Sequence, residues 1–183
     1  MSDQDLFYLL ALLKVEGVGD IMAKKLLANC GNAEAVFKTK INQIAAIDGV
    51  GSALLHNLKD KSVFEKASRE LEFIHANDIN TSFFQDESYP ERLKHCFDSP
   101  VLIFSSGNIN LKNKKIISIV GTRQITSYGI EFCKKLIDDL APLDPIIVSG
   151  FAYGVDIVAH QLAIDCNLQT IGVLAHGLNQ IYP

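Results

Sequence analysis

The chain has 183 residues, of which 48% are hydrophobic and 21% are charged, a composition typical of one globular domain or two small ones. Its formal net charge of −4 counts against a protein that coats nucleic acid through a broad basic face, and no apolar run reaches the ~20 residues that span a bilayer. The N-terminus lacks the basic start of a signal peptide and the four cysteines form no C-x-x-C pair, so we expect a cytoplasmic protein with reduced thiols and no metal site.

Residues 1–65 are predicted to form a small all-α domain. Two similar phrases, VEGVGDIMAKKLL at 15–27 and IDGVGSALLHNL at 47–58, each join a Gly-Val-Gly turn to an amphipathic helix, with Asp20 and Ser52 as candidate N-caps. The doublet resembles helix-hairpin-helix motifs, whose turn and helix N-terminus can hold a DNA phosphate without reading sequence. The alternative is that both turns only pack a small module. It is favoured at Asp20, because an acid repels phosphate.

Residues 66–115 are predicted to connect this domain to the rest of the chain. The pattern indicates a helix to about Asn77, a short strand near 81–84, a Tyr-Pro turn, a short helix and a strand at 101–104. Phe83, Phe84 and Tyr89 are a candidate base-stacking set, but their interleaving with aliphatic residues favours core packing.

Residues 116–183 alternate strand and helix. Strands are predicted at 116–120, 146–150 and 170–174, separated by amphipathic helices that begin near Tyr128 and Val155. This order predicts an α/β fold: a Rossmann-like parallel sheet with right-handed crossovers and helices on both faces. A doubly wound sheet has two such halves. We therefore expect that the sequence is part of a longer protein or that another copy covers the open edge.

Three loops leave the carboxyl ends of these strands, where open parallel sheets bind ligands. They are GTRQITSYG at 121–129, SGFAYGVD at 149–156 and AHGLNQIYP at 175–183. The first lacks the further glycines of a dinucleotide fingerprint and carries Arg123, whose planar, permanently charged fork suits a phosphate. We expect the remaining phosphate oxygens to be bound by the hydroxyls of Thr122 and Thr126 and by backbone N–H groups at the helix start.

The charged and aromatic side chains of residues 116–183 bear on the predicted phosphate site. Residues 116–183 carry three basic residues, Arg123, Lys134 and Lys135, so an anion site there depends on very few cations. Tyr128 is predicted to pack its helix against the sheet, and stacking on a base is the alternative.

Three sequence motifs, in this order along the chain, resemble those of a known protein family. The first is Val120-Gly121-Thr122-Arg123 with Thr126 and Tyr128-Gly129; the second is Ser149-Gly150, Ala152 and Gly154-Val155-Asp156 with Ala159-His160; the third is Gly177-Leu178 with Tyr182-Pro183. Together they resemble the DNA-processing protein A family, DprA or Smf, bacterial proteins of natural transformation. The sequence departs from the family pattern at Tyr153, where Lys or Arg is frequent, and at Asn179, where Asp is usual.

The resemblance implies a function and a set of site residues. It implies single-stranded DNA binding and RecA loading in DNA uptake, transformation and recombination, without a cofactor, a membrane or catalysis. The DNA-binding residues that it carries over are Gly121, Thr122, Arg123, Thr126, Tyr128, Gly129, Ser149, Gly150, Ala152, Gly154 and Gly177. It further implies a RecA-type recombinase as partner and a homodimer, both through a later half of the Rossmann-like domain that this sequence does not contain.

A nucleotide-processing enzyme is the alternative function, on the related Rossmann variant of nucleoside-monophosphate phosphoribohydrolases. The chain lacks the P-G-G-x-G-T-x-x-E phrase of that group. Asp156 and His160 lie four residues apart on one predicted helix face, but a structural pair is favoured over an acid–base pair. No G-x-S-x-G elbow surrounds Ser127 or Ser149, and no metal spacing is present.

Overall fold

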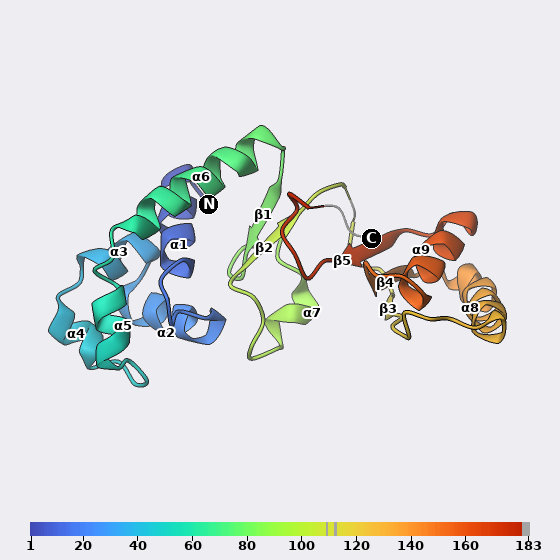
Figure 1. Ribbon diagram of the computed structural model, residues 1–183, viewed down its shortest axis with the longest axis horizontal. Helices are drawn as coiled ribbons and strands as arrows, with labels where there is room; N and C mark the ends of the chain where they lie inside the picture. The colour runs from blue at the N-terminus through green and yellow to red at the C-terminus, as the bar shows by residue number, and fades with distance from the viewer. Residues whose placement is uncertain (109, 112, 181–183) are drawn as a thin grey trace. The chain divides into compact units, whose positions relative to one another are not determined.

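The computed structural model describes residues 1–108, 110–111 and 113–180 and divides into two compact units, Met1–Ser106 and Gly107–Pro183 (Figure 1). The predicted fold class is confirmed: a small all-α region precedes a parallel three-stranded sheet with helices. Of the predicted connector, 66–115, residues 66–106 lie in the first unit. No helix in the described ranges is long and apolar enough to cross a membrane.

Six helices build most of the first unit. Their bounds are α1 Asp3–Leu13, α2 Asp20–Cys30, α3 Ala33–Lys38, α4 Ile41–Ala45, α5 Ser52–Asn57 and α6 Ser62–Ala76. A capping box starts α1: the Asp5 N–H bonds the Ser2 hydroxyl, and the Asp5 carboxylate accepts from the Ser2 N–H. The apolar face of α1 packs against α6 and α3, and its buried leucines belong to the core of this unit.

The two Gly-Val-Gly phrases bind each other as a pseudo-symmetric pair. Lys25, on the helix of the first phrase, donates to the Asp48 carbonyl of the second turn at 3.2 Å. Asn57, at the equivalent position of the second phrase, donates to the Glu16 carbonyl of the first turn at 3.1 Å. Lys25 also forms a 2.9 Å ion pair with the Asp48 carboxylate. These reciprocal contacts support the packing interpretation of the doublet.

The connector completes the core of this unit. Strand β1 (Asn80–Phe83) pairs antiparallel with β2 (Leu102–Ser105), and α7 (Glu91–Lys94) lies between them in the chain. Phe83 and Phe84 pack on the core, and Tyr89 is only 2% exposed, with its hydroxyl donating to the Pro100 carbonyl at 2.6 Å. The prediction of core packing for these three aromatic residues is confirmed.

The predicted N-cap roles of Asp20 and Ser52 are wrong. Gly19 and Gly51 occupy the cap positions, so both polar residues are the first residues of their helices. The Asp20 carboxylate instead accepts the Val101 N–H at 2.8 Å, a bond across 81 positions of sequence. This long-range bond anchors the start of β2 on α2.

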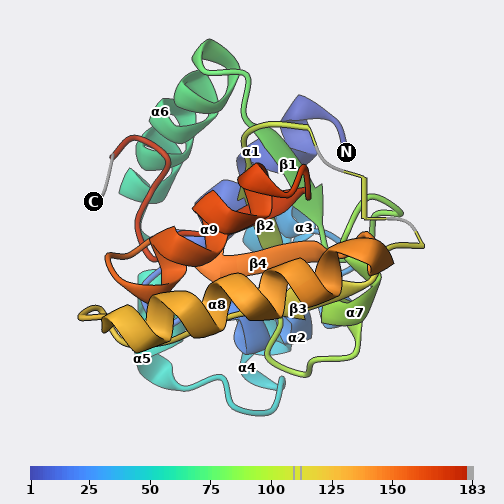
Figure 2. The ribbon, with the colours of Figure 1, turned by 90° about the vertical axis from the view of Figure 1, so that its right-hand side faces the viewer.

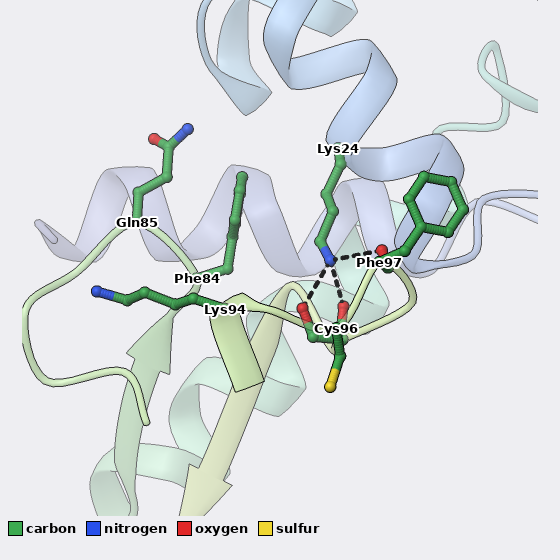
Figure 3. Close-up of a pocket in the computed structure, with 7 residues that line it drawn as sticks. Lys24, Phe84, Gln85, Lys94, Cys96 and Phe97 are labelled. Carbon is green, nitrogen blue, oxygen red and sulfur yellow. Dashed lines mark hydrogen bonds between the residues drawn. The ribbon is translucent and has the colours of Figure 1, made fainter. Parts of the chain in front are cut away.

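Lys24 makes a second anchor between α2 and the connector. Its ammonium donates to the Ser99 carbonyl at 2.6 Å, to the Ser99 hydroxyl at 2.8 Å and to the Phe97 carbonyl at 3.3 Å (Figure 3). The three oxygens lie beside an open hollow of roughly 300 Å³ that Phe84 also lines. Because its three donors are occupied by protein oxygens, Lys24 serves the fold rather than an external anion.

We predict that Asp20→Ala destabilises the first unit by about 1–3 kcal/mol, because it leaves the partly buried Val101 N–H without its acceptor. Hydrogen exchange should show faster exchange at the Val101 amide and along β2. Ser52→Ala is the matched control, since Ser52 occupies the equivalent position and makes no cap bond. Equal protection of Val101 in the two variants would contradict the anchoring role.

The second unit is a three-stranded parallel sheet in the order β3-β4-β5. Its elements are β3 Ile116–Ser118, α8 Ser127–Leu140, the 3-10 helix η1 Ala141–Leu143, β4 Ile146–Gly150, α9 Val155–Asp165 and β5 Thr170–Val173. Apolar residues of the strands and helices, including Ile137, Ile147 and Ala159, form a core separate from that of the first unit.

Helices α8 and α9 pack side by side on one face of this sheet (Figures 1 and 2). The sequence predicted helices on both faces. The difference follows from the strand order: with β3, β4 and β5 in sequence across the sheet, two right-handed crossovers place both helices on the same side. A helix on the other face requires the strand order to reverse, which does not occur among the described strands.

Candidate nucleic-acid interface

The loops after β3 and β4 interlock at the carboxyl edge of the sheet. The Thr122 carbonyl accepts the N–H of Val155, the first residue of α9, at 3.1 Å. The Thr122 hydroxyl accepts the Gln124 N–H at 3.1 Å and so closes the turn around Arg123. The first loop therefore takes its shape from its own turn and from the start of α9.

Gly154 makes this close approach feasible. Its φ is +86°, and a Cβ atom added there would lie 2.1 Å from the Thr122 carbonyl oxygen and 2.7 Å from the Arg123 Cα. No other residue type fits this backbone conformation and this space together. The second loop thus supports the backbone of Arg123 from below, and the two loops form one continuous surface.

Arg123 lies exposed on that surface. Its guanidinium makes no hydrogen bond or ion pair with any other described residue, whereas Lys134 lies 3.6 Å from Asp138. An arginine buried in an ion pair would be unavailable to a ligand. The structure instead presents a fixed positive charge whose five N–H donors are open to an anion.

The start of α8 adjoins Arg123. Thr126 is the N-cap, and its hydroxyl accepts the Gly129 N–H at 3.2 Å while its own O–H remains able to donate. The first N–H groups of a helix have no partner within the helix, and they carry partial positive charge. The loop therefore combines one full charge with a helix N-terminus, the arrangement that the sequence predicted for phosphate.

Tyr128 is 76% exposed, so the prediction that it packs α8 against the sheet is wrong. The reason is helical geometry: Cys133 and Ile137 are the buried residues of α8, and Tyr128 lies five and nine positions earlier, on the opposite side of the helix. The alternative of base stacking is left open to it.

Ser149 does not reach the surface. It is 2% exposed, and its hydroxyl donates to the Ile119 carbonyl at 2.6 Å, so it joins β4 to the chain after β3. The position follows from strand alternation, since Ser149 shares a sheet face with the buried Ile147. This placement argues against the DNA-contacting role that the resemblance implied for Ser149.

The other predicted site residues divide by exposure. Gly121, Thr122, Arg123, Thr126, Tyr128 and Gly177 are exposed, and Gly129, Gly150, Ala152 and Gly154 are partly buried. The partly buried glycines have packing roles; a Cβ at Gly150, for example, would lie 2.4 Å from an Asp156 carboxylate oxygen. In the third loop the Gln180 N–H donates to the Gly177 carbonyl at 3.1 Å. Tyr182 and Pro183, which complete the third phrase, lie outside the described residues.

His160 is a structural residue whose partners differ from those expected. Its Nε2 lies 2.8 Å from the Gly150 carbonyl oxygen, to which it donates, and its Nδ1 lies 2.7 Å from the Thr170 hydroxyl. The ring therefore ties α9 to the ends of β4 and β5. The expected pairing with Asp156 is wrong, because both ring nitrogens bond other groups.

Metal and thiol chemistry find no support in the described ranges. No group of three His, Cys, Asp or Glu side chains there is placed to hold a metal ion. The four cysteines are free thiols, although Cys96 is exposed rather than packed. Desolvation, and then the hydrogen bond to the Asp138 carboxylate, raise the pKa of the Cys166 thiol above its ordinary value. A raised pKa keeps a thiol protonated and weakly nucleophilic.

The fold and the site define an α/β protein whose interlocked strand-end loops present one open arginine among exposed aromatic side chains. The chain belongs to the family described as DNA recombination-mediator protein A, whose model matches residues 80–183.

Relatives and a solved structure extend this assignment. The chain is 34% identical over 142 residues to the DNA processing protein DprA of Bacillus subtilis, covering 77% of this chain and 48% of the relative. It is 27% identical over 191 residues to the protein Smf of Synechocystis, covering 100% of this chain and 47% of the relative. The X-ray structure of DprA from Streptococcus pneumoniae matches with a TM-score of 0.68 and 27% identity, over 100% of this chain and 61% of that one. The chain thus spans about half the length of these two curated relatives.

Exposed aromatic residues in the second loop were missed as site candidates. Phe151 is 46% and Tyr153 is 56% exposed, and both lie between β4 and α9. The sequence places both residues in a loop that follows a strand, but it carries no signal that tells whether their rings pack or face solvent.

Proposed function

We propose that this chain binds single-stranded DNA through the loops at the carboxyl edge of its parallel sheet and acts in DNA uptake and recombination. The observation that carries the proposal is Arg123: an exposed guanidinium without a protein partner among the described residues, on a backbone supported by Gly154 and next to the N-terminus of α8. A single phosphate is the group that suits this combination of charge and N–H donors.

Family membership supports the wider role. The family is described as a DNA recombination mediator, and its relatives are named DNA processing proteins. We therefore propose that the protein acts in the cytoplasm and passes the bound strand to a RecA-type recombinase. Because the chain spans about half of its relatives, we assign recombinase contact and formation of a homodimer to the remaining half of such proteins.

Two of the groups considered for the enzyme alternative, Ser149 and His160, are engaged within the fold. Hydrolysis of a nucleotide needs a nucleophile or a base within reach of the substrate. Ser149 is buried against the Ile119 carbonyl, and both nitrogens of His160 are bonded within the fold.

A direct experiment separates the two functions. The 183-residue chain is incubated with oligo-dT and, separately, with AMP. We expect retention of the oligonucleotide that weakens as salt rises, and no release of ribose phosphate from AMP. Release of ribose phosphate without retention of the oligonucleotide would overturn the proposal in favour of the enzyme.

A further inference from the structure

His160 is a buried titratable residue that the proposed function does not use. It lies on α9, it is 9% exposed, and each of its ring nitrogens lies within hydrogen-bond distance of an oxygen. Histidine is the side chain that ordinarily gains or loses a proton between about pH 5 and pH 8. The hydrogen bonds of a buried histidine with two engaged nitrogens therefore depend on the number of protons that its ring carries.

The ring of His160 belongs to a row of three contacts. Its Nε2 lies 2.8 Å from the Gly150 carbonyl oxygen, and its Nδ1 lies 2.7 Å from the Thr170 hydroxyl. This hydroxyl in turn lies 2.9 Å from the Ile147 carbonyl oxygen. The two carbonyl oxygens can only accept, and the hydroxyl has one proton to donate. Three hydrogen bonds in this row therefore need one proton from Thr170 and two from the ring.

A neutral ring leaves one of the three contacts without a proton, because it carries a single N–H group. If that proton is on Nε2, Thr170 donates to Nδ1 and brings its oxygen against the Ile147 carbonyl oxygen with no proton between them. If it is on Nδ1, the Nε2 lone pair faces the Gly150 carbonyl oxygen. A ring with two protons donates at both nitrogens, and Thr170 donates to Ile147. The complete row therefore belongs to the cationic ring.

The elements packed around His160 place one carboxylate near this row. Asp156 lies one turn earlier on α9, and a Cβ at Gly150 would lie 2.4 Å from its carboxylate oxygen. Strands β4 and β5, which pack on α9, contain no charged residue, and the Phe151 ring centroid lies 5.7 Å from that of His160. Helix α8 packs beside α9 and buries Cys133 and Ile137. The remaining charged residues of α8 and α9 are exposed: Glu131, Lys134, Lys135, Asp138, Asp139 and Asp165.

We propose that His160 is a proton-responsive clamp between α9 and the sheet. With two ring protons it bonds Gly150 of β4 and Thr170 of β5 while Thr170 bonds Ile147, and with one proton it loses one of these bonds. Folding holds an oxygen in place for each ring proton, so the added stability is present at low pH and is lost as the pH rises and the ring loses a proton. This inference goes beyond the proposed function and does not rest on it.

Nitrogen NMR of the 183-residue chain, with ¹⁵N-labelled histidine, counts the ring protons directly. The signals of His160 are assigned by their absence in His160→Gln. We expect both ring nitrogens to carry a slowly exchanging proton at about pH 6 and one of them to have lost it at about pH 8. A proton count for His160 that is the same at the two pH values would overturn the proposal.

Hydrogen exchange in β4, corrected for the intrinsic exchange rate at each pH, measures the effect on the sheet. The equilibrium constant for opening should fall about threefold to tenfold from about pH 8 to about pH 6, the contribution of one hydrogen bond. Thr170→Val keeps a β-branched side chain but removes the hydroxyl, so it should abolish this dependence, whereas Thr170→Ser should retain it. The other histidines contribute equally to all three proteins.

The same pH dependence in Thr170→Val and in the unaltered chain would contradict the clamp. If Thr170→Val does not fold, the proton count of His160 in the unaltered chain still decides the question, because that measurement needs no variant of Thr170.

Discussion

Gly154→Ala is expected to lower the free energy of unfolding of the second unit by roughly 3–5 kcal/mol. This figure adds the cost of holding a non-glycine residue at positive φ to the cost of an overpacked contact. The added methyl group would lie 2.1 Å from the Thr122 carbonyl oxygen, so the two loops must separate or α9 must shift. Single-strand binding should fall with it, because the Arg123 backbone loses its support. Urea unfolding followed by hydrogen exchange in β3, β4 and β5 measures the effect.

Gly107→Ala is the matched control for this prediction. Gly107 also has a positive φ, +95°, but no atom lies within 4 Å of an added Cβ. Its substitution carries the backbone strain without the collision and should cost about 1–2 kcal/mol. Equal destabilisation by the two substitutions would show that the contact between the loops does not matter.

Arg123→Ala is expected to weaken oligonucleotide binding about tenfold, on oligo-dT and oligo-dA alike, since a phosphate contact carries no sequence information. Arg123→Lys should lose part of this affinity, because it keeps the charge but not the planar fork. Lys135→Ala removes the same charge from an exposed position on α8, away from the loops, and should have little effect. A loss that depends on the base would contradict a phosphate role for Arg123.

Much of the second unit was predictable from sequence because its signals are local. Strand β4 matches its predicted bounds, and β3 and β5 end within two residues of theirs, since each apolar run is closed by glycine or polar residues. The position of the candidate site follows from the same pattern, because strand-end loops of a parallel sheet share one edge. The sequence pattern alone therefore predicts that Arg123 lies at this edge of the sheet.

The wrong predictions concern either a partner far away in sequence or the side of an element on which a residue lies. The Asp20 carboxylate bonds an amide 81 residues away, a partner that no local rule reveals. Tyr128 was predicted to pack from its position at the helix start, and Ser149 was carried over from the family resemblance. Neither prediction considered the side of the helix or strand on which the residue lies. Helical and strand periodicity counted from the buried Ile137 and Ile147 would have placed both correctly.

The exposed aromatic residues show a different limit. Sequence composition distinguishes an aromatic loop from a basic one, but it does not distinguish a ring that packs from a ring that faces solvent. Tyr89 and Tyr153 both lie in turns, yet one is 2% and the other 56% exposed. The difference is set by residues distant in sequence, such as Pro100, whose carbonyl binds the Tyr89 hydroxyl.

The most direct test of the account measures the dependence of oligo-dT affinity on salt concentration for the unaltered chain and for Arg123→Ala. Each phosphate contact on a single strand contributes about 0.7 to the slope of log affinity against log salt. We predict that the substitution flattens the slope by about that amount. An identical slope in the two proteins would contradict the claim that Arg123 holds a phosphate of the DNA backbone.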